Sequence, residues 1–343
     1  MRFSCGLPAP FHDETLTSWL YRISLKRRIV VGERELLLAR PRIAWAGVNP
    51  IDEDLDFDFS TVYFKKNTIS LALNEQAVKC FFSAKNIALV NPGRRTHFCS
   101  ICLREDIVRG QMPGWRKSWC ARDAVICAFH GVDLSVLGVN ATFRKSWDAY
   151  IQSVQPNIAL DPWLSVNFQR LRRDLIQRIK LWRKRQNKRA RKLFFNLYDL
   201  FLLAPTYNHE AGVARFLFGR KPTRKYSQLI TFEDAILHGA ELSDIKARFG
   251  GQVLAAYVLG GIREKEILKL RASCIRHGIA FPKIEEIIPM IHFGCATSAD
   301  YEYLHSHLGR FTRKAGSKLD CLFARFEKNI GSRIFHSQLR FGR

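Results

Sequence analysis

Residues 98–106 read Phe-Cys-Ser-Ile-Cys-Leu-Arg-Glu-Asp, and residues 125–134 read Val-Ile-Cys-Ala-Phe-His-Gly-Val-Asp-Leu. Each stretch holds two metal-ligand side chains separated by two residues: Cys99 with Cys102, and Cys127 with His130. A tight turn brings such a pair onto one ion, and two pairs complete a tetrahedral site. The spacing predicts a small zinc-finger module with one Zn²⁺ bound by these four residues.

A redox role and a different ligand set stay open for this cysteine cluster. A Cys-x-x-Cys pair can be a redox site, but such pairs open a helix in a thioredoxin-like unit, and none is visible here. Cys120 and His97 are alternative ligands in the same region, although Cys120 also reads as an ordinary buried thiol. Four ligands leave no open coordination position, so the metal is expected to be structural rather than catalytic.

A second group of Cys and His residues lies nearer the end of the chain. Its spacing is compatible with zinc, but buried cysteines and surface histidines account for it better. The four residues are Cys274, His277, His292 and Cys295.

The composition indicates a basic globular protein. The chain has 343 residues, of which 47% are hydrophobic, which excludes wholesale disorder and allows two or three domains. Its formal net charge of +24 favours a polyanionic partner. The longest uncharged stretches, such as 250–262, are too short to span a bilayer, and residues 1–18 lack a signal-peptide core. We therefore expect no membrane partner and a cytoplasmic location.

Helical spacing of apolar residues dominates, so we expect a mainly α fold with several domains and the small zinc-finger module. The first helix is expected over 16–38, capped by Thr15 or Thr17, with an alternating strand pattern confined to 59–73 and 125–143. Helix breaks are expected at Pro205, Pro222, Gly250-Gly251, Gly260-Gly261 and Pro282. The acidic stretch 52–58 reads as a solvated loop, or else as an acidic knob that faces a partner or the chain itself.

Four segments follow from these patterns. They are an N-terminal helical region (1–90), the zinc-finger module (91–145), a basic helical region (146–225) and a C-terminal helical domain (226–343).

Residues 170–192 are expected to form one strongly basic helix. This stretch holds twelve Lys or Arg residues and a single acid, Asp174. An apolar stripe from Leu171 to Trp182 leaves the cations on the other face. A charge run is ordinarily just a solvated face, but this density favours contact with nucleic-acid phosphates. The candidate binding residues are Arg172, Arg173, Arg178, Lys180, Arg183, Lys184, Arg185, Lys188 and Arg189.

The C-terminal segment contains a helix-turn-helix-like pattern. Residues 242–250 resemble a first helix that ends in a glycine turn, and 252–260 would form the second helix. The second helix is almost wholly apolar, whereas a recognition helix needs polar side chains that reach base edges. We therefore expect 252–260 to be core, and Arg263 and Lys265 to be better DNA candidates. Phenylalanines interleaved with cations in 310–343 read as core, or else as base-stacking residues.

Two stretches together resemble a known family. Residues 8–22 read Pro-Ala-Pro-Phe-His-Asp-Glu-Thr-Leu-Thr-Ser-Trp-Leu-Tyr-Arg and resemble the opening of TniQ/TnsD proteins. The cysteine region is similar to the zinc-finger signature of that family, with Cys-x-x-Cys-Leu-x-x-Asp, then the aromatic-Arg pair Trp115-Arg116, then Cys-x-x-His-Gly-x-x-Leu. The resemblance covers about residues 5–140, and only the four zinc ligands carry over as residue roles.

The resemblance implies a target-selection protein of a bacterial transposition system. Such proteins contact target DNA or dock on an RNA-guided Cascade complex, and they recruit an AAA+ ATPase regulator. The implied partners are DNA and the ATPase, with the Cascade complex as partner if the chain is an adaptor of little DNA specificity. A homodimer is a further state to test, and the implied location is the nucleoid. The third alternative is a basic, zinc-containing transcription regulator.

An enzyme is not expected. Residues 219–223 read Gly-Arg-Lys-Pro-Thr, with a proline where the helix of a Walker A phosphate loop should begin. The chain has no Gly-x-Ser-x-Gly elbow and no His-Glu-x-x-His metal helix.

Overall fold

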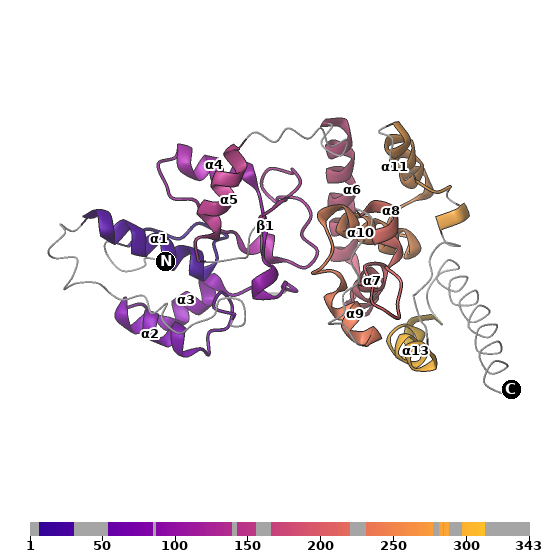
Figure 1. Cartoon of the computed structure of the whole chain (residues 1–343), viewed down its shortest axis with the longest axis horizontal. Coiled ribbons are helices and arrows are strands. Elements are labelled where there is room, and N and C mark those ends of the chain that lie inside the picture. Colours follow the sequence, from indigo (N-terminus) through magenta and orange to yellow (C-terminus); the bar gives the residue numbers. More distant parts are fainter. Residues whose placement is uncertain are drawn as a thin grey trace. The chain divides into compact units, whose positions relative to one another are not determined.

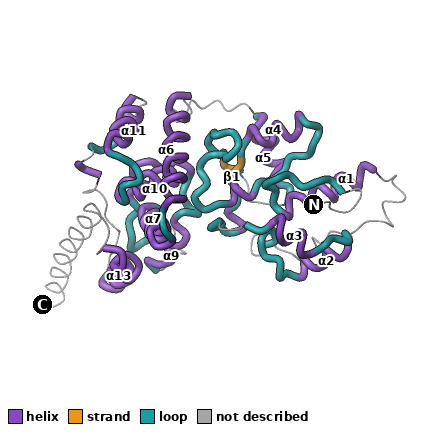
Figure 2. Tube along the Cα trace, turned by 180° about the vertical axis from the view of Figure 1, so that it is seen from behind, coloured by secondary structure: helices purple, strands orange, loops and turns teal. Residues whose placement is uncertain are grey.

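The structure is a computed structural model that describes residues 7–30, 54–84, 87–138, 143–155, 166–219, 231–276, 281–283, 285–287 and 297–312. Within these ranges the chain is mainly helical, as predicted, and its only sheet is one antiparallel pair of short strands (Figure 2). The chain divides into two compact units, Met1–Ile158 and Ala159–Arg343. The finer division into four segments stays a prediction. In the described ranges no helix has the length and apolarity that crossing a membrane requires.

Three helices build the apolar core of the first unit: α1 (Leu16–Val30), α2 (Val62–Ser70) and α3 (Glu75–Phe82). The predicted face of α1 is buried at Leu16, Trp19, Leu20 and Ile23. Thr17 does not cap α1, because its hydroxyl donates to Asp56 instead.

The strand pattern expected within 59–73 is wrong. Thr61 caps α2 by accepting a hydrogen bond from the backbone N–H of Phe64. Tyr63, Phe64, Asn67 and Thr68 are buried, and this spacing is one face of a helix rather than alternate positions of a strand.

Two acids of the acidic stretch, Asp54 and Asp56, do not lie in a solvated loop, whereas Asp58 is exposed. Both carboxylate oxygens of Asp54 accept hydrogen bonds of 2.7 Å from the guanidinium of Arg95. Asp56 is buried and accepts from the backbone N–H and the hydroxyl of Thr17 at 3.0 and 2.6 Å. Burial alone would raise the pKa of Asp56, but the charges of Lys145 and Arg95 hold this pKa below its ordinary value. These two acids therefore face the chain itself.

The cysteine region continues the first unit. The two strands of the sheet are β1 (His97–Phe98) and β2 (Ser135–Val136), in the antiparallel register His97 to Val136 and Phe98 to Ser135. β2 lies in the predicted strand region 125–143. Helices α4 (Ser100–Val108) and α5 (Lys145–Val154) belong to the same region and contact each other. The 3₁₀ turns η2 (Pro92–Arg94) and η3 (Lys117–Cys120) complete the module.

The second unit is a helical assembly around α10 (Ile245–Val258), as Figure 1 shows. This helix contacts α6 (Val166–Arg185), α7 (Lys188–Phe201) and α8 (Val213–Phe218). The outer helices are α9 (Phe232–Gly239) and α13 (Ser298–Thr312), which contact α7, and α11 (Glu264–Arg276), which contacts α6.

The turn expected at Gly250-Gly251 is wrong, because both glycines lie inside α10. A Cβ at Gly250 would come within 2.1 Å of the Phe218 ring, so the glycine lets α8 pack closely on α10. The apolar stretch that follows is core, as expected, and Gln252 is buried with it. The chain does break at Gly260, which has a φ of 76°.

The single basic helix expected over 170–192 is also wrong. Helix α6 ends at Arg185, and Asn187 caps α7 by accepting from the backbone N–H of Ala190 at 2.8 Å. An asparagine at this position competes with helix continuation, because its side chain binds the free N–H groups of a new first turn.

Candidate metal centre and nucleic-acid interface

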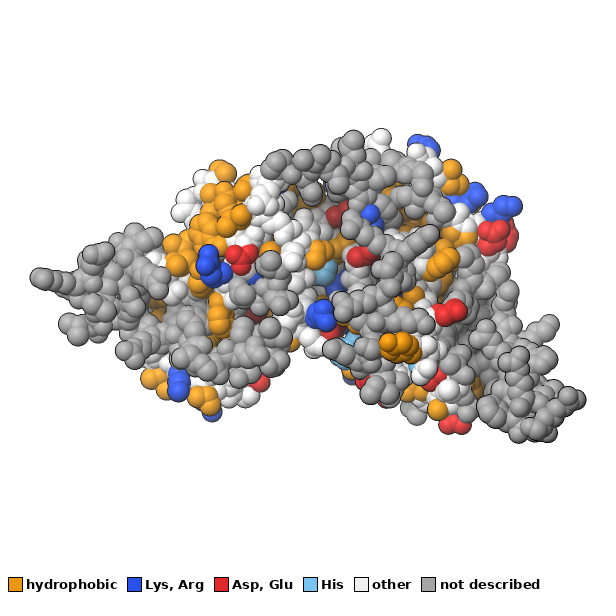
Figure 3. All heavy atoms as spheres, in the orientation of Figure 1, with side chains coloured by type: hydrophobic (Ala, Val, Ile, Leu, Met, Phe, Trp, Pro, Cys, Tyr) orange, Lys and Arg blue, Asp and Glu red, His pale blue; other side chains and the backbone are white. Residues whose placement is uncertain are grey.

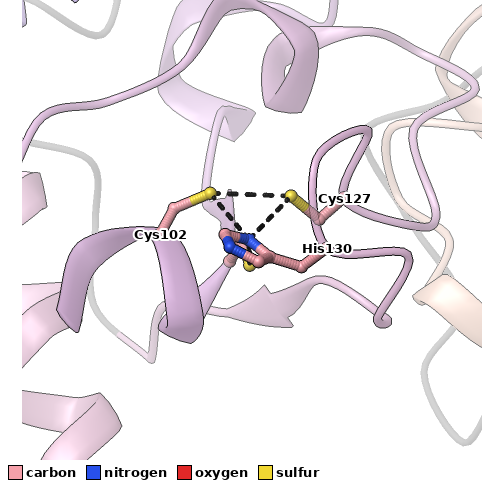
Figure 4. A group of neighbouring side chains, drawn as sticks. Cys102, Cys127 and His130 are labelled. Carbon is pink, nitrogen blue, oxygen red and sulfur yellow. Dashed lines mark hydrogen bonds between the residues drawn. The ribbon is translucent and has the colours of Figure 1, made fainter. Parts of the chain in front are cut away.

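The structure brings Cys99, Cys102, Cys127 and His130 together. Their ligand atoms all lie within 4.8 Å of one another. Figure 4 shows the side chains of Cys102, Cys127 and His130 pointing toward one another. The Cys102 and Cys127 sulfurs are 3.6 Å apart, and Nδ1 of His130 lies 3.2 to 3.7 Å from the three sulfurs. A tetrahedral zinc with ordinary bond lengths separates two sulfurs by about 3.8 Å and a sulfur from a nitrogen by about 3.6 Å. The group therefore has the dimensions of a closed four-ligand site.

Backbone geometry explains how the two ligand pairs form. Cys99 is the N-cap residue of α4, and Cys102 lies in its first turn. In the second pair, the N–H of Gly131 donates to the carbonyl of Cys127 at 2.9 Å, and Gly131 has a φ of 64°. Glycine adopts this left-handed conformation without strain, which accounts for the glycine directly after His130. The β1–β2 pairing then places both turns side by side.

A carboxylate holds the far side of the histidine ring. Nε2 of His130 lies 2.9 Å from Oε1 of Glu105, while the other oxygen of Glu105 accepts from Arg109 at 2.9 Å. This contact favours the tautomer that carries its proton on Nε2 and leaves Nδ1 free for a metal. The sequence reasoning missed Glu105, although its place one helical turn after Cys102 is a usable signal.

Hydrogen bonding within the group favours a thiolate. Hydrogen bonds from Cys102 and Cys99 lower the pKa of Cys127, whereas hydrogen bonds to its two neighbours raise the pKa of Cys102. Burial would lower the pKa of His130, but its bonds to Glu105 and Cys127 raise this pKa above the ordinary value. A thiolate beside further thiols is the donor set that divalent zinc prefers.

The alternative ligands do not join this group. Cys120 is buried and points its thiol to the carbonyl of Arg116 at 3.6 Å. His97 is buried in β1 and lies outside the four-residue group. Of the second Cys/His group, Cys274 is buried in α11, and its other three members lie outside the described residues.

The segment between the two metal-ligand pairs interlocks with the N-terminal segment. Glu14 accepts two hydrogen bonds from Arg22, at 2.8 and 2.7 Å. Arg116 donates to Asp106 of α4 at 2.6 Å. The ring of Phe11 lies against both guanidinium groups, 3.8 Å from that of Arg22 and 4.2 Å from that of Arg116. Residues 8–22 and the cysteine region therefore form one folded body.

Comparison with known families identifies this body. Residues 6–134 match the family model described as TniQ. This region belongs to the TniQ family. Searches of the curated proteins and of the solved structures give no match. The TniQ region contains α1 to α4 and all four metal-ligand residues, so the motifs that suggested the resemblance lie inside the matched range.

Beyond the TniQ region, the candidate phosphate-binding residues differ widely in exposure. Arg172 is only 2% exposed and lies over the ring of Phe168 at 5.0 Å, so it does not present a charge to solvent. Arg178 forms an ion pair with Glu266. Arg173 lies 3.7 Å from Asp174 and is half-buried. Several cations of α6 that were predicted to bind phosphate therefore contact other residues of the protein instead.

The cations near the end of α6 and the start of α7 are more accessible. Lys184, Arg185, Lys188 and Arg189 are exposed, whereas Lys180 and Arg183 are half-buried. Two further exposed cations, Arg191 and Lys192, lie beside them and were not nominated from the sequence.

The candidates of α11 lie among acids. Arg263 is exposed and lies 3.5 Å from Glu266. Lys265 is exposed between Glu264 and Glu266 in the first turn of the helix. The cations predicted within 313–343 lie outside the described residues.

Apolar side chains gather over α4 and α5 on one face of the TniQ-bearing unit (Figure 3). Val108 of α4 and Ile151 and Val154 of α5 are exposed there.

Proposed function

We propose that this protein selects target sites for DNA transposition, and that its role is to bind and recruit rather than to catalyse. The TniQ region carries this proposal, because family membership associates the chain with transposition target selection. The partners of the proposed role are the target DNA and an AAA+ ATPase regulator of the transposase. The protein would act on the nucleoid in the bacterial cytoplasm, where the target DNA lies.

We further propose that the four-residue group binds one Zn²⁺. The residues that would hold it are Cys99, Cys102, Cys127 and His130, whose spacing matches a tetrahedral ion. Bound zinc would supply a cross-link between the two turns and no chemistry on a substrate, since no ligand position stays open. Its contribution is then to the stability of the TniQ region.

A second candidate function is that of an adaptor whose target site is determined by an RNA-guided Cascade complex. One observation favours it: α10, which contains most of the second helix of the helix-turn-helix-like pattern, is buried along its length except at Lys246. A buried helix cannot place side chains in a major groove. The protein could then bind DNA without choosing its sequence.

Selection from a random duplex pool separates these two functions. The purified protein is incubated with the pool at about physiological salt, where non-specific contacts are weak, and the retained duplexes are sequenced. An enriched motif would establish direct reading of the target. Salt-sensitive retention without enrichment would establish the adaptor. A protein that retains no duplex, and that does not bind the ATPase regulator in a pull-down, would contradict both.

A further inference from the structure

The break between α6 and α7 presents a compact group of exposed cations. We define the α6–α7 turn surface by its five members, Lys184, Arg185, Lys188, Arg191 and Lys192. All five side chains are exposed, and no ion pair engages them among the residues that the structure describes. They fall within nine consecutive positions, so their charges act together on one partner.

Nothing in the local sequence neutralises these cations. No acidic residue occurs between Asp174 and Asp199. Lys188 and Arg191 lie in the first two turns of α7, where positive charge opposes the helix macrodipole. Helix stability therefore gives no reason for Lys188 and Arg191, whereas an anionic partner does. Lys184 and Arg185 lie in the last turn of α6, where positive charge also suits the helix dipole.

The aromatic side chains near this surface are already engaged. Arg183 lies over the rings of Phe194 and Phe195, at 5.0 and 4.9 Å from their centres. Trp182 packs against Phe194 with ring centres 6.1 Å apart, and its ring lies against Gly261. Single-stranded nucleic acid is usually bound by aromatic side chains that stack on its bases. The aromatic side chains beside this surface are therefore not available to stack on unpaired bases. Exposed cations in such surroundings suit a nucleic-acid duplex, whose bases already stack on one another.

We propose that the α6–α7 turn surface binds the phosphate backbone of duplex DNA without reading its sequence. The inference rests on the proposed function and adds to it the place and the mode of the DNA contact. Backbone contacts by lysine and arginine release counterions, so affinity should fall steeply with salt, with a slope of about −0.9 for each phosphate neutralised. Such contacts hold a protein on a target that another component has chosen.

Two matched double variants test the surface. K188A/K192A removes two exposed lysines four positions apart near the start of α7. K65A/K66A removes two exposed lysines of α2, in the unit Met1–Ile158. Both variants lower the net charge of the full chain equally. K188A/K192A also removes charge that opposes a helix dipole, so it should not weaken the fold.

The measurement is the affinity of each full-length variant for a random-sequence DNA duplex over a series of salt concentrations. We expect K188A/K192A to bind roughly 10–100-fold more weakly at 0.1 M salt and to reduce the salt slope by about 2, equally for all sequences. K65A/K66A should change affinity less than about threefold. Equal losses in both variants would show diffuse attraction to net charge and overturn the assigned surface.

Two further outcomes also overturn it. Unchanged binding by K188A/K192A would place the contact elsewhere, and stronger competition by duplex RNA than by duplex DNA would change the partner. Target selection is scored separately, by mapping insertions in cells that lack the protein. Loss of targeting together with unchanged duplex binding by K188A/K192A would overturn the surface and leave the proposed function standing.

Discussion

At the residue scale, Glu105 is expected to set the metal affinity of the site. Its carboxylate holds the imidazole of His130 with Nδ1 directed at the three thiols. Removing such a partner typically weakens metal binding by about 10–100-fold. Glu105→Ala should therefore release zinc to a chelator at a correspondingly lower chelator concentration, measured by competition with a colorimetric chelator.

Two variants control this prediction. Glu105→Gln keeps an oxygen that can accept from Nε2 and should retain most of the affinity. Arg104→Ala changes the exposed neighbour on the same helix and should have no effect. Equal zinc retention by Glu105→Ala and the unaltered protein would show that Glu105 does not position the histidine.

Cys120 gives a second prediction at this scale, one of pH dependence. Burial raises the pKa of its thiol from 9.0 to about 11. The stability that comes from keeping this thiol neutral is therefore fully present below pH 9 and is lost as the pH rises through about 11. The loss amounts to about 2–3 kcal/mol. Urea unfolding at pH 8 and pH 11 should show it in the unaltered protein and not in Cys120→Ala.

The same pH-dependent loss in both proteins would assign the titration to another group. Cys80→Ser, which changes an exposed cysteine, is the control that should behave as the unaltered protein does.

The sequence was most informative at residues whose partners are fixed by local spacing. Cys99 and Cys102, and likewise Cys127 and His130, could be paired because a tight turn is a local structure. Arg172 was misjudged because its burial beside Phe168 depends on packing around α6, and its charge alone does not show this. Asp56 was misjudged for the same reason, since its cations lie 39 and 89 positions further along the chain, at Arg95 and Lys145.

At the element scale, the close contact of α8 with α10 depends on Gly250. A methyl group there would lie 2.1 Å from the Phe218 ring, which is itself held against Phe249 and Phe281. Gly250→Ala should destabilise the second unit by about 1–3 kcal/mol, although alanine is the better helix former by about 1 kcal/mol. Urea unfolding followed by circular dichroism measures the change.

Gly251→Ala is the matched control for this prediction. Its methyl group would lie 3.1 Å from side-chain atoms of Leu202 and Tyr198, which can shift by a few tenths of an ångström. A Gly250→Ala protein as stable as Gly251→Ala would show that α8 is not closely packed on α10.

Helices were predicted well where the spacing of their own apolar residues determines them. They were predicted poorly where packing against a neighbouring helix determines whether the helix continues. The buried face of α1 follows from apolar spacing alone. A glycine pair normally suggests a break, but Gly250-Gly251 continues α10 because α8, α7 and α10 must pack closely there. At Asn187 the opposite error occurs: a break was not expected, but the side chain of Asn187 caps α7. The basic stretch 170–192 is therefore divided between two helices.

At the scale of the whole molecule, metal removal should affect one unit only. The four ligand residues lie in the unit Met1–Ile158, and α6 to α13 lie in Ala159–Arg343. A chelator, or Cys102→Ser with loss of about one zinc per chain, should expose the backbone amides of residues 95–140. Hydrogen exchange of the full chain, read by mass spectrometry, should show this increase with unchanged protection of α7 and α10. An unaltered protein that is fully folded without zinc would contradict it.

The overall organisation was partly accessible from the sequence. The mainly helical class follows from periodicity, and β2 of the small sheet lies within the strand pattern expected over 125–143. The interlock of Glu14 and Arg22 with the Asp106–Arg116 pair could not be derived, because it joins segments almost one hundred positions apart. The family match over residues 6–134 includes these interacting residues. It does not extend into the second unit.

The most direct measurement of target selection is a map of transposon insertions. The transposition system is run in cells with and without this protein, and the insertion sites are sequenced across the genome. We expect insertions at the preferred target to disappear without the protein and to return when it is supplied again. The same distribution of insertions in its absence would contradict a role in target selection.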